Sequence, residues 1–207
     1  MASALETAID LPGLASHVDS LTLPSGRKLM LRFAQPDDSD RLQRYFRSLS
    51  QASRHNRLMS GAPELPAPQL DRFVHSGEAD AYTLIASMAD DDGDDVIGEV
   101  RYGHFGPDVE FGLSVADRWR GQAIGSAMLA NLECRAAALG GERLFGDTLR
   151  SNSAMISLAR SSGYQFSPTP YDWKQVRLEK PVTYRPIDIP CTTWRLAAGA
   201  RQSATSW

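Results

Sequence analysis

VADRWRGQAIGS, residues Val115 to Ser126, ends a strand-like segment and opens a long helix. The turn between them carries Arg120 and two glycines, Gly121 and Gly125. Main-chain N–H groups at the start of a helix lack intrahelical acceptors and carry the positive end of the helix dipole, so they can bind a phosphate without a cationic side chain. The stretch therefore predicts an anion site built from backbone amides. The alternative is a plain helix start whose glycines only permit the turn.

Two familiar phosphate loops are excluded by the spacing of this turn. No Gly-Lys-Ser/Thr follows the glycines, so the loop is not a Walker motif. The glycine spacing also differs from a dinucleotide-binding fingerprint, and the preceding strands are patterned like antiparallel ones.

The flanking sequence predicts an α/β (α+β) domain with one mixed central sheet flanked by helices. Apolar residues at helical spacing predict a helix that starts at Pro36 and another that carries Met128 to Leu139. Asn152 opens a shorter helix that ends before Gly163. Strands are expected at 28–33, 82–88, 96–102, 109–115, 143–148, 164–166 and 173–178. Because strands and helices are interspersed along the chain, a layered α/β structure is favoured.

Residues 22–180 are expected to form this single domain, with an N-terminal extension at 1–21 and a C-terminal tail at 181–207 that is interrupted by three prolines. The acidic stretch at 90–95 is interpreted as a solvated hairpin turn, because it lacks the spaced ligands of a calcium loop.

Composition excludes several classes of protein. The net charge is −3, which argues against broad electrostatic binding to nucleic acid or to an acidic membrane. Cys134 and Cys191 have no metal-ligand spacing, so no metal is expected, and a reduced cytoplasmic location is favoured. No stretch approaches the ~20 apolar residues that a membrane span requires.

The loop resembles the acetyl-CoA site of the GNAT acetyltransferase superfamily, in which a strand is followed by Arg/Gln-x-x-Gly-x-Gly/Ala. Ala123 is a departure, since a glycine usually stands there. Asn152 to Met155, with Gly163-Tyr164, is similar to the family's second cofactor motif. The resemblance implies acetyl-CoA as cosubstrate, with Asn152 near it. It assigns the cofactor to the backbone of two strand residues and to seven loop residues: Leu113, Val115, Arg120, Gly121, Gln122, Ala123, Ile124, Gly125 and Ser126.

Two further stretches resemble the bacterial Pat-type protein-lysine acetyltransferases within this superfamily. Residues 45–54, YFRSLSQASR, resemble their Phe-Phe-x-x-Leu-Ser-x-x-Ser-Arg signature. Residues 109–117, VEFGLSVAD, resemble the glutamate-bearing strand that precedes their loop. The resemblance implies a protein lysine as acceptor and Glu110 as general base.

Acetyl transfer to an amine needs a base, because a lysine with a pKa of about 10.4 is almost fully protonated at neutral pH. Glu110 shares one strand face with Gly112 and Ser114, a small polar face that suits a cleft. Glu99 is the second candidate base, and Glu110 as a merely solvent-facing residue is the alternative. Many relatives carry a tyrosine as general acid seven residues after the motif asparagine, where this chain has Ala159. Asn152 would contact cofactor or water, or only cap its helix.

The sequence thus predicts an acetyl-CoA-dependent N-acetyltransferase. The acceptor is expected to be a protein lysine, with a small amine as the alternative, and a non-catalytic acyl-CoA sensor as the alternative from another class. Arg54, His55 and Arg57 either line an acceptor channel or form a solvated loop. Aromatic and apolar residues of the tail could form a homodimer contact or pack on their own domain: Trp194, Leu196 and Trp207.

Overall fold

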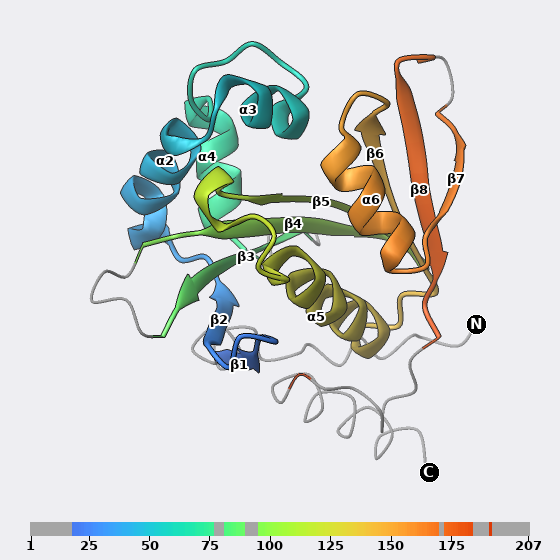
Figure 1. Ribbon diagram of the computed structural model, residues 1–207, viewed down its shortest axis with the longest axis horizontal. Helices are drawn as coiled ribbons and strands as arrows, with labels where there is room; N and C mark the ends of the chain where they lie inside the picture. The colour runs from blue at the N-terminus through green and yellow to red at the C-terminus, as the bar shows by residue number, and fades with distance from the viewer. Residues whose placement is uncertain (1–17, 77–80, 90–94, 170–171, 184–190, 192–207) are drawn as a thin grey trace, which may run out of the picture.

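One twisted sheet organises the chain (Figure 1). The computed structural model describes residues 18–76, 81–89, 95–169, 172–183 and 191. Within them, eight strands are hydrogen-bonded in the order β1-β2-β3-β4-β5-β6-β8-β7. All neighbours run antiparallel except β5 and β6, which are parallel. The strands are β1 (Asp19–Thr22), β2 (Lys28–Phe33), β3 (Ala81–Met88), β4 (Gly98–Phe105), β5 (Asp108–Val115), β6 (Arg143–Leu149), β7 (Gln165–Pro168) and β8 (Gln175–Pro181).

Helices cover both faces of the sheet. They are α2 (Ser39–Ser48), α3 (Gln51–Leu58), α4 (Ala67–Val74), α5 (Ile124–Ala138) and α6 (Ser153–Ser161), with short 3-10 turns η1 (Pro36–Asp38) and η3 (Asp117–Trp119). Leu84 and Ala86 of β3 belong to the hydrophobic cluster that includes α5 and α6, whereas Ile85 between them belongs to the cluster of α2 and α4. Since side chains alternate along a strand, the sheet separates these two cores.

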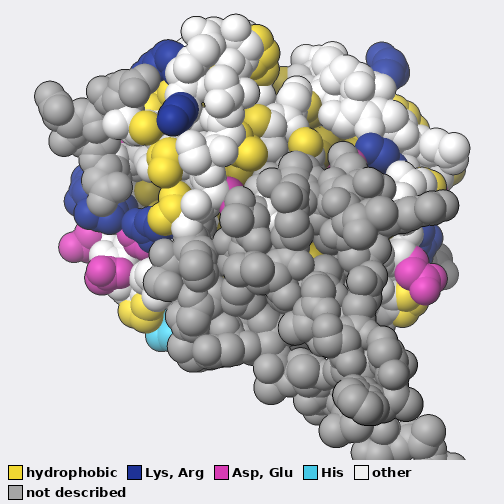
Figure 2. All heavy atoms as spheres, turned by 90° about the horizontal axis from the view of Figure 1, so that it is seen from below, with side chains coloured by type: hydrophobic (Ala, Val, Ile, Leu, Met, Phe, Trp, Pro, Cys, Tyr) yellow, Lys and Arg dark blue, Asp and Glu magenta, His cyan; other side chains and the backbone are white. Residues whose placement is uncertain are grey.

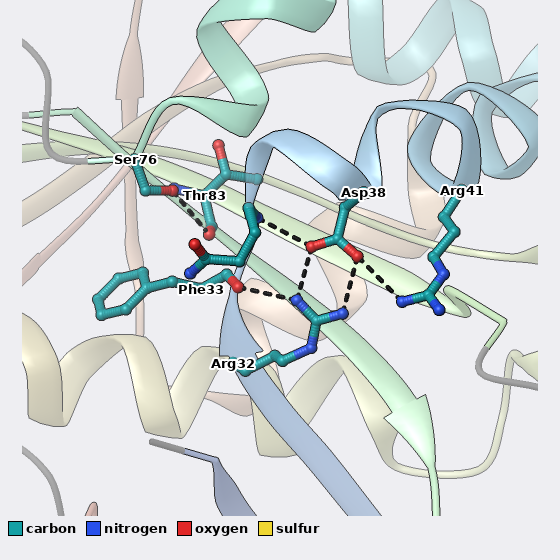
Figure 3. Close-up of polar contacts among 7 residues, drawn as sticks. Arg32, Phe33, Asp38, Arg41, Ser76 and Thr83 are labelled. Carbon is teal, nitrogen blue, oxygen red and sulfur yellow. Dashed lines mark hydrogen bonds and ion pairs between the residues drawn. The ribbon is translucent and has the colours of Figure 1, made fainter. Parts of the chain in front are cut away.

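The start of α2 is fixed by a buried carboxylate (Figure 3). Arg32 donates to both oxygens of Asp38, at 2.6 and 2.7 Å, and Arg41 donates to it at 3.2 Å. The backbone N–H of Gln35 adds a bond of 2.8 Å. Burial by itself would raise the pKa of Asp38, but the bonds from Arg32, Gln35 and Arg41 outweigh it and lower the pKa.

The structure confirms a single mixed α/β domain and most of the expected elements. The helix start at Pro36 is confirmed, and so are the strands, with small shifts at their ends. Sequence reasoning missed β1, which crosses the expected boundary at residue 21 and pairs with β2. Between the first two expected strands it predicted one helix and an optional second, where the described residues form three. Most of the acidic turn, residues 90–94, lies outside the described residues.

β5 and β6 pair over a short distance and then separate. Their register covers only Asp108 to Glu110 on β5, whereas β5 stays paired with β4 as far as Val115. Gly146 of β6 stands where pairing stops, and a Cβ there would lie 2.6 Å from the carbonyl oxygen of Phe111. Among the described strands, none pairs with the second half of β5 on the side of β6, so this edge is free beside the loop that opens α5.

Surface charge is mixed on the face that Figure 2 shows, where Lys and Arg side chains lie among Asp and Glu. Among the described residues, no helix has both the length and the apolar character to cross a membrane.

Candidate functional site

A cavity of about 310 Å³ lies where the free edge of β5 meets the start of α5. Its walls come from α3, β5, η3 and the loop after it, the start of α5 and the first two turns of α6. The residues that line it are Ser53, Asn56, Arg57, Leu113, Ser114, Val115, Trp119, Arg120, Gly121, Ala123, Ile124, Gly125, Ser126, Asn152, Ala154, Met155 and Leu158.

The first backbone amides of α5 are not capped by the side chain of the N-cap residue and have no acidic side chain beside them in the first turn. The N-cap residue, Ala123, makes no side-chain capping bond, and the first turn of α5 holds no acidic side chain. Gly125 packs against α6, since a Cβ there would lie 3.1 Å from Leu158. A helix of this length with an uncapped, acid-free start is well suited to bind an anion such as a diphosphate.

Two residues of the loop have left-handed backbone angles. Gly121 has φ +75°, which glycine adopts without strain. Ala123 has φ +62°, which is unfavourable for a residue with a Cβ. The backbone thus adopts at Ala123 the conformation that explains why related loops carry glycine there.

Amides of β5 point into the same gap. The N–H of Ala116 bonds to Ile97 on the β4 side, at 2.8 Å. Because backbone groups alternate along a strand, the N–H groups of Leu113 and Val115 point the other way, toward the β6 side where pairing has ended. These donors can meet an acyl carbonyl or an amide of a bound ligand.

Hydrogen bonds from Ser50 and Ser53 to Asp117 hold the loop against α3. Ser50 caps α3 by accepting from Ser53 N–H, and Asp117 accepts from Ser50 N–H at 2.9 Å and from Ser53 Oγ at 2.6 Å. Arg120 donates to Ser53 Oγ at 2.9 Å and pairs with Asp117. Burial would raise the pKa of Asp117, but these bonds lower it. These hydrogen bonds give Ser50 and Ser53, which belong to the signature at residues 45–54, a structural role.

A second cavity, of about 580 Å³, adjoins the first. Both are lined by Asn56, Arg57, Leu113, Asn152 and Met155. Glu110 is exposed and lines the second cavity, directly across from Gly103 of β4. The carboxylate therefore lies on the side of the sheet edge that a second substrate could reach.

A buried polar network supports the wall between the cavities. Arg57 grips Glu99 through Nε at 2.6 Å and Nη2 at 2.9 Å, and Ser114 donates to Glu99 at 2.5 Å. Tyr45 bonds to Ser114 at 2.9 Å. Burial and the charge of Glu99 raise the pKa of Tyr45. The glutamate is fully buried and fully engaged, so the geometry disfavours Glu99 as a base.

Gly112 makes room for Arg57. A Cβ at Gly112 would lie 2.8 Å from Nη1 of Arg57. Burial would lower the pKa of Arg57, but Glu99 outweighs this and raises it. Of the three polar residues expected after the first helix, Arg57 thus lines both cavities, Arg54 donates to the carbonyls of Leu49 and Arg47, and His55 is exposed.

Asn152 is held by its own neighbourhood. Its Oδ1 accepts from Met155 N–H at 3.3 Å, which caps α6, and its Nδ2 donates to Thr148 at 3.0 Å. It lines both cavities, so a polar group stands at their junction.

The structure brings nearly all the expected site residues together. The first cavity gathers Leu113, Val115, Arg120, Gly121, Ala123 to Ser126 and Asn152, while Gln122 is exposed and lines neither cavity. Sequence reasoning missed Asn56 and Arg101, which come from separate elements. Among the described residues, no group of three His, Cys, Asp or Glu could hold a metal ion.

Comparison with known proteins agrees with this geometry. Residues 43–164, more than half of the chain, match the family model described as Acetyltransferase (GNAT) family. Acetyltransferase PA5475 of Pseudomonas aeruginosa is 23% identical over 157 residues, which cover 75% of this chain and 84% of that protein.

Solved structures with the same fold include the GNAT domain of S. lividans PAT, which is 26% identical with a TM-score of 0.72 and covers 79% of this chain and 96% of that one. A cAMP-binding acyltransferase from Mycobacterium smegmatis is 21% identical with a TM-score of 0.56. That match covers 92% of this chain but 56% of the other.

Proposed function

Because the chain belongs to the acetyltransferase (GNAT) family, we propose that it is an acetyl-CoA-dependent N-acetyltransferase whose acceptor is a protein lysine. One observation carries the proposal. The first cavity, which contains the uncapped amides at the start of α5, adjoins the second cavity, which Glu110 lines, at the free edge of β5.

The residues of the first cavity fit coenzyme A. The uncapped amides of Ile124, Gly125 and Ser126 suit its diphosphate, and the free edge of β5 suits its extended amide-bearing arm. Acetyl-CoA supplies a thioester, whose carbonyl carbon is the electrophile.

Glu110 acts as the general base in this proposal. It takes a proton from the acceptor ammonium, directly or through water, so that the neutral amine can attack the thioester carbonyl. The N–H groups of Leu113 and Val115 stabilise the negative oxygen as the C–N bond forms and the C–S bond breaks. With Ala159 buried where many relatives carry a tyrosine, the second proton that the nitrogen loses after attack passes through water to the leaving thiolate. The thiolate is a tolerable leaving group because thiol pKa values are about 8.5.

A protein lysine is preferred as acceptor for two reasons. The sequence resembles the Pat-type enzymes at residues 45–54 and 109–117, and the fold is similar to the GNAT domain of S. lividans PAT. The second cavity is also open at Glu110, which is exposed, so a side chain carried by a large partner can reach it.

The test combines binding with turnover. Calorimetry measures acetyl-CoA affinity, and a thiol-release assay with a cognate lysate or a panel of small amines measures transfer. Glu110→Gln should keep the affinity for acetyl-CoA but slow thiol release by about 10²–10⁴-fold at neutral pH. Glu142→Gln is the matched control, because Glu142 is exposed and lines neither cavity.

Each alternative predicts a different result. Acetylation of small amines without labelling of lysate proteins would assign a small-molecule acceptor. Tight acetyl-CoA binding with equally slow thiol release by wild type and Glu110→Gln on every acceptor would favour an acyl-CoA sensor.

A further inference from the structure

Arg101, on β4, lines the same cavity as Glu110 and has no carboxylate partner among the described residues. Its Nη1 donates to the carbonyl of Arg72 at 2.6 Å and to Thr83 at 3.0 Å. Its guanidinium also lies over the ring of Phe73, 5.0 Å from the centroid. These contacts fix the side chain but use only one of its nitrogens.

Other arginines of the chain show what the unused nitrogens do. Nε and Nη2 together grip a carboxylate in Arg57, in Arg143 and in Arg177. This edge of the guanidinium matches the two oxygens of a carboxylate. Within the described part of the chain, the same edge of Arg101 forms no hydrogen bond.

Among the described residues, no carboxylate that lines this cavity forms an ion pair with Arg101. Glu99 is engaged by Arg57, and Asp147 is engaged by Arg177. Among the described lining residues, Glu110 forms no ion pair either, and Arg72 lies exposed on α4. Burial and the charges of Arg57 and Arg72 lower the pKa of Arg101, and the charge of Glu99 offsets this only in part.

Arg101 and Glu110 stand on the same face of the sheet. Arg101 pairs across the strands with Gly112, and Glu110 with Gly103, so the two charged residues are diagonal neighbours and each faces a glycine across the β4–β5 pair. In an antiparallel pair, the backbones of two diagonal residues are about 7–8 Å apart. In an extended peptide, residues two apart share a face and lie about 7 Å apart.

From this spacing we propose that Arg101 binds a carboxylate carried by the acceptor, two residues from the lysine whose ammonium meets Glu110. The site thus takes a zwitterionic acceptor, an amine with a carboxylate nearby. The inference rests on the proposed function for the identity of the amine site, but not for the anion contact itself.

Paired peptides test the inference without altering the protein. One peptide carries lysine with glutamate two residues away, and the other carries glutamine at that position. On wild type we expect about tenfold higher kcat/KM, and about tenfold tighter binding to the CoA-loaded protein, for the glutamate peptide. Free lysine against 1,5-diaminopentane is the small-molecule arm.

Variants then assign the preference. Arg101→Gln should erase the glutamate preference. Arg101→Lys should keep part of it, because the charge remains but the two adjacent N–H donors of the guanidinium are lost. Arg44→Gln is the control, since Arg44 is exposed on α2 and lines neither cavity. Thermal unfolding checks that each variant folds.

The outcomes separate this inference from the proposed function. Preferential binding of the glutamate peptide that Arg101→Gln abolishes supports the carboxylate site even if no acetyl group is transferred. If free lysine binds better than 1,5-diaminopentane, this preference requires Arg101, and the peptides show no such preference, the carboxylate site is supported. The carboxylate that it binds then belongs to a small acceptor. Equal binding and equal turnover of both acceptor pairs on wild type would overturn the inference, even with robust acetyl transfer.

Discussion

Replacing Ala123 by glycine should stabilise the protein, although glycine usually weakens a helix. Ala123 has φ +62°, a conformation that costs a residue with a Cβ about 1–2 kcal/mol. Glycine avoids that cost but gives the unfolded chain more freedom, which offsets about 0.4–1 kcal/mol. The net gain is therefore about 0.5–1 kcal/mol, which for a chain of this size raises Tm by about 1–4 °C.

The reverse exchange two residues away is the matched control. Gly121 has φ +75°, and a Cβ there would meet no atom within 4 Å, so Gly121→Ala adds backbone strain without a clash. It should destabilise by about 0.5–1 kcal/mol for the same reasons with the sign reversed. Urea unfolding of both variants measures the two free energies. If Ala123→Gly lowered stability, or Gly121→Ala raised it, the assignment of left-handed strain to this loop would be refuted.

Three further predictions concern polar groups that stabilise the fold and the site. Glu99→Gln leaves the buried Arg57 without its counter-charge and should cost about 3 kcal/mol in urea unfolding, with an unchanged midpoint counting against the network. Asp38 has a lowered pKa, so its stabilising contribution is complete above its unfolded pKa of about 3.9 and is lost as pH falls through the folded value. Acid titration should therefore show a loss of stability below about pH 4 that is smaller in Asp38→Asn; parallel curves would exclude this role. Asn152→Ala removes the cap of α6 and should cost about 1 kcal/mol by thermal unfolding, whereas no loss would mean that the bond to Met155 contributes little.

Helix starts that depend on neighbouring residues could be predicted from the sequence. Pro36-Asp37-Asp38 was sufficient to predict the start of α2, and the turn after Val115 was sufficient to predict the start of α5. Ala123 was visible as a departure from the family pattern, but only backbone angles reveal that it adopts the glycine conformation.

Contacts between distant segments were not predictable in this way. The short strand β1 has four residues and gains its place from β2, so nothing within it signals a strand. Arg57 reaches Glu99 across 42 positions, because Gly112 leaves space above β5. Arg101 carries no motif, and it becomes a candidate only because the register of β4 and β5 sets it diagonal to Glu110.

A crystal structure of the protein with bound acetyl-CoA would test the central claim most directly. We predict that the diphosphate lies on the amides of Ile124, Gly125 and Ser126, and that the thioester carbonyl lies at the free edge of β5 on the side facing Glu110. A cofactor that bound away from the start of α5, or whose thioester could not be reached from the cavity of Glu110, would contradict the claim.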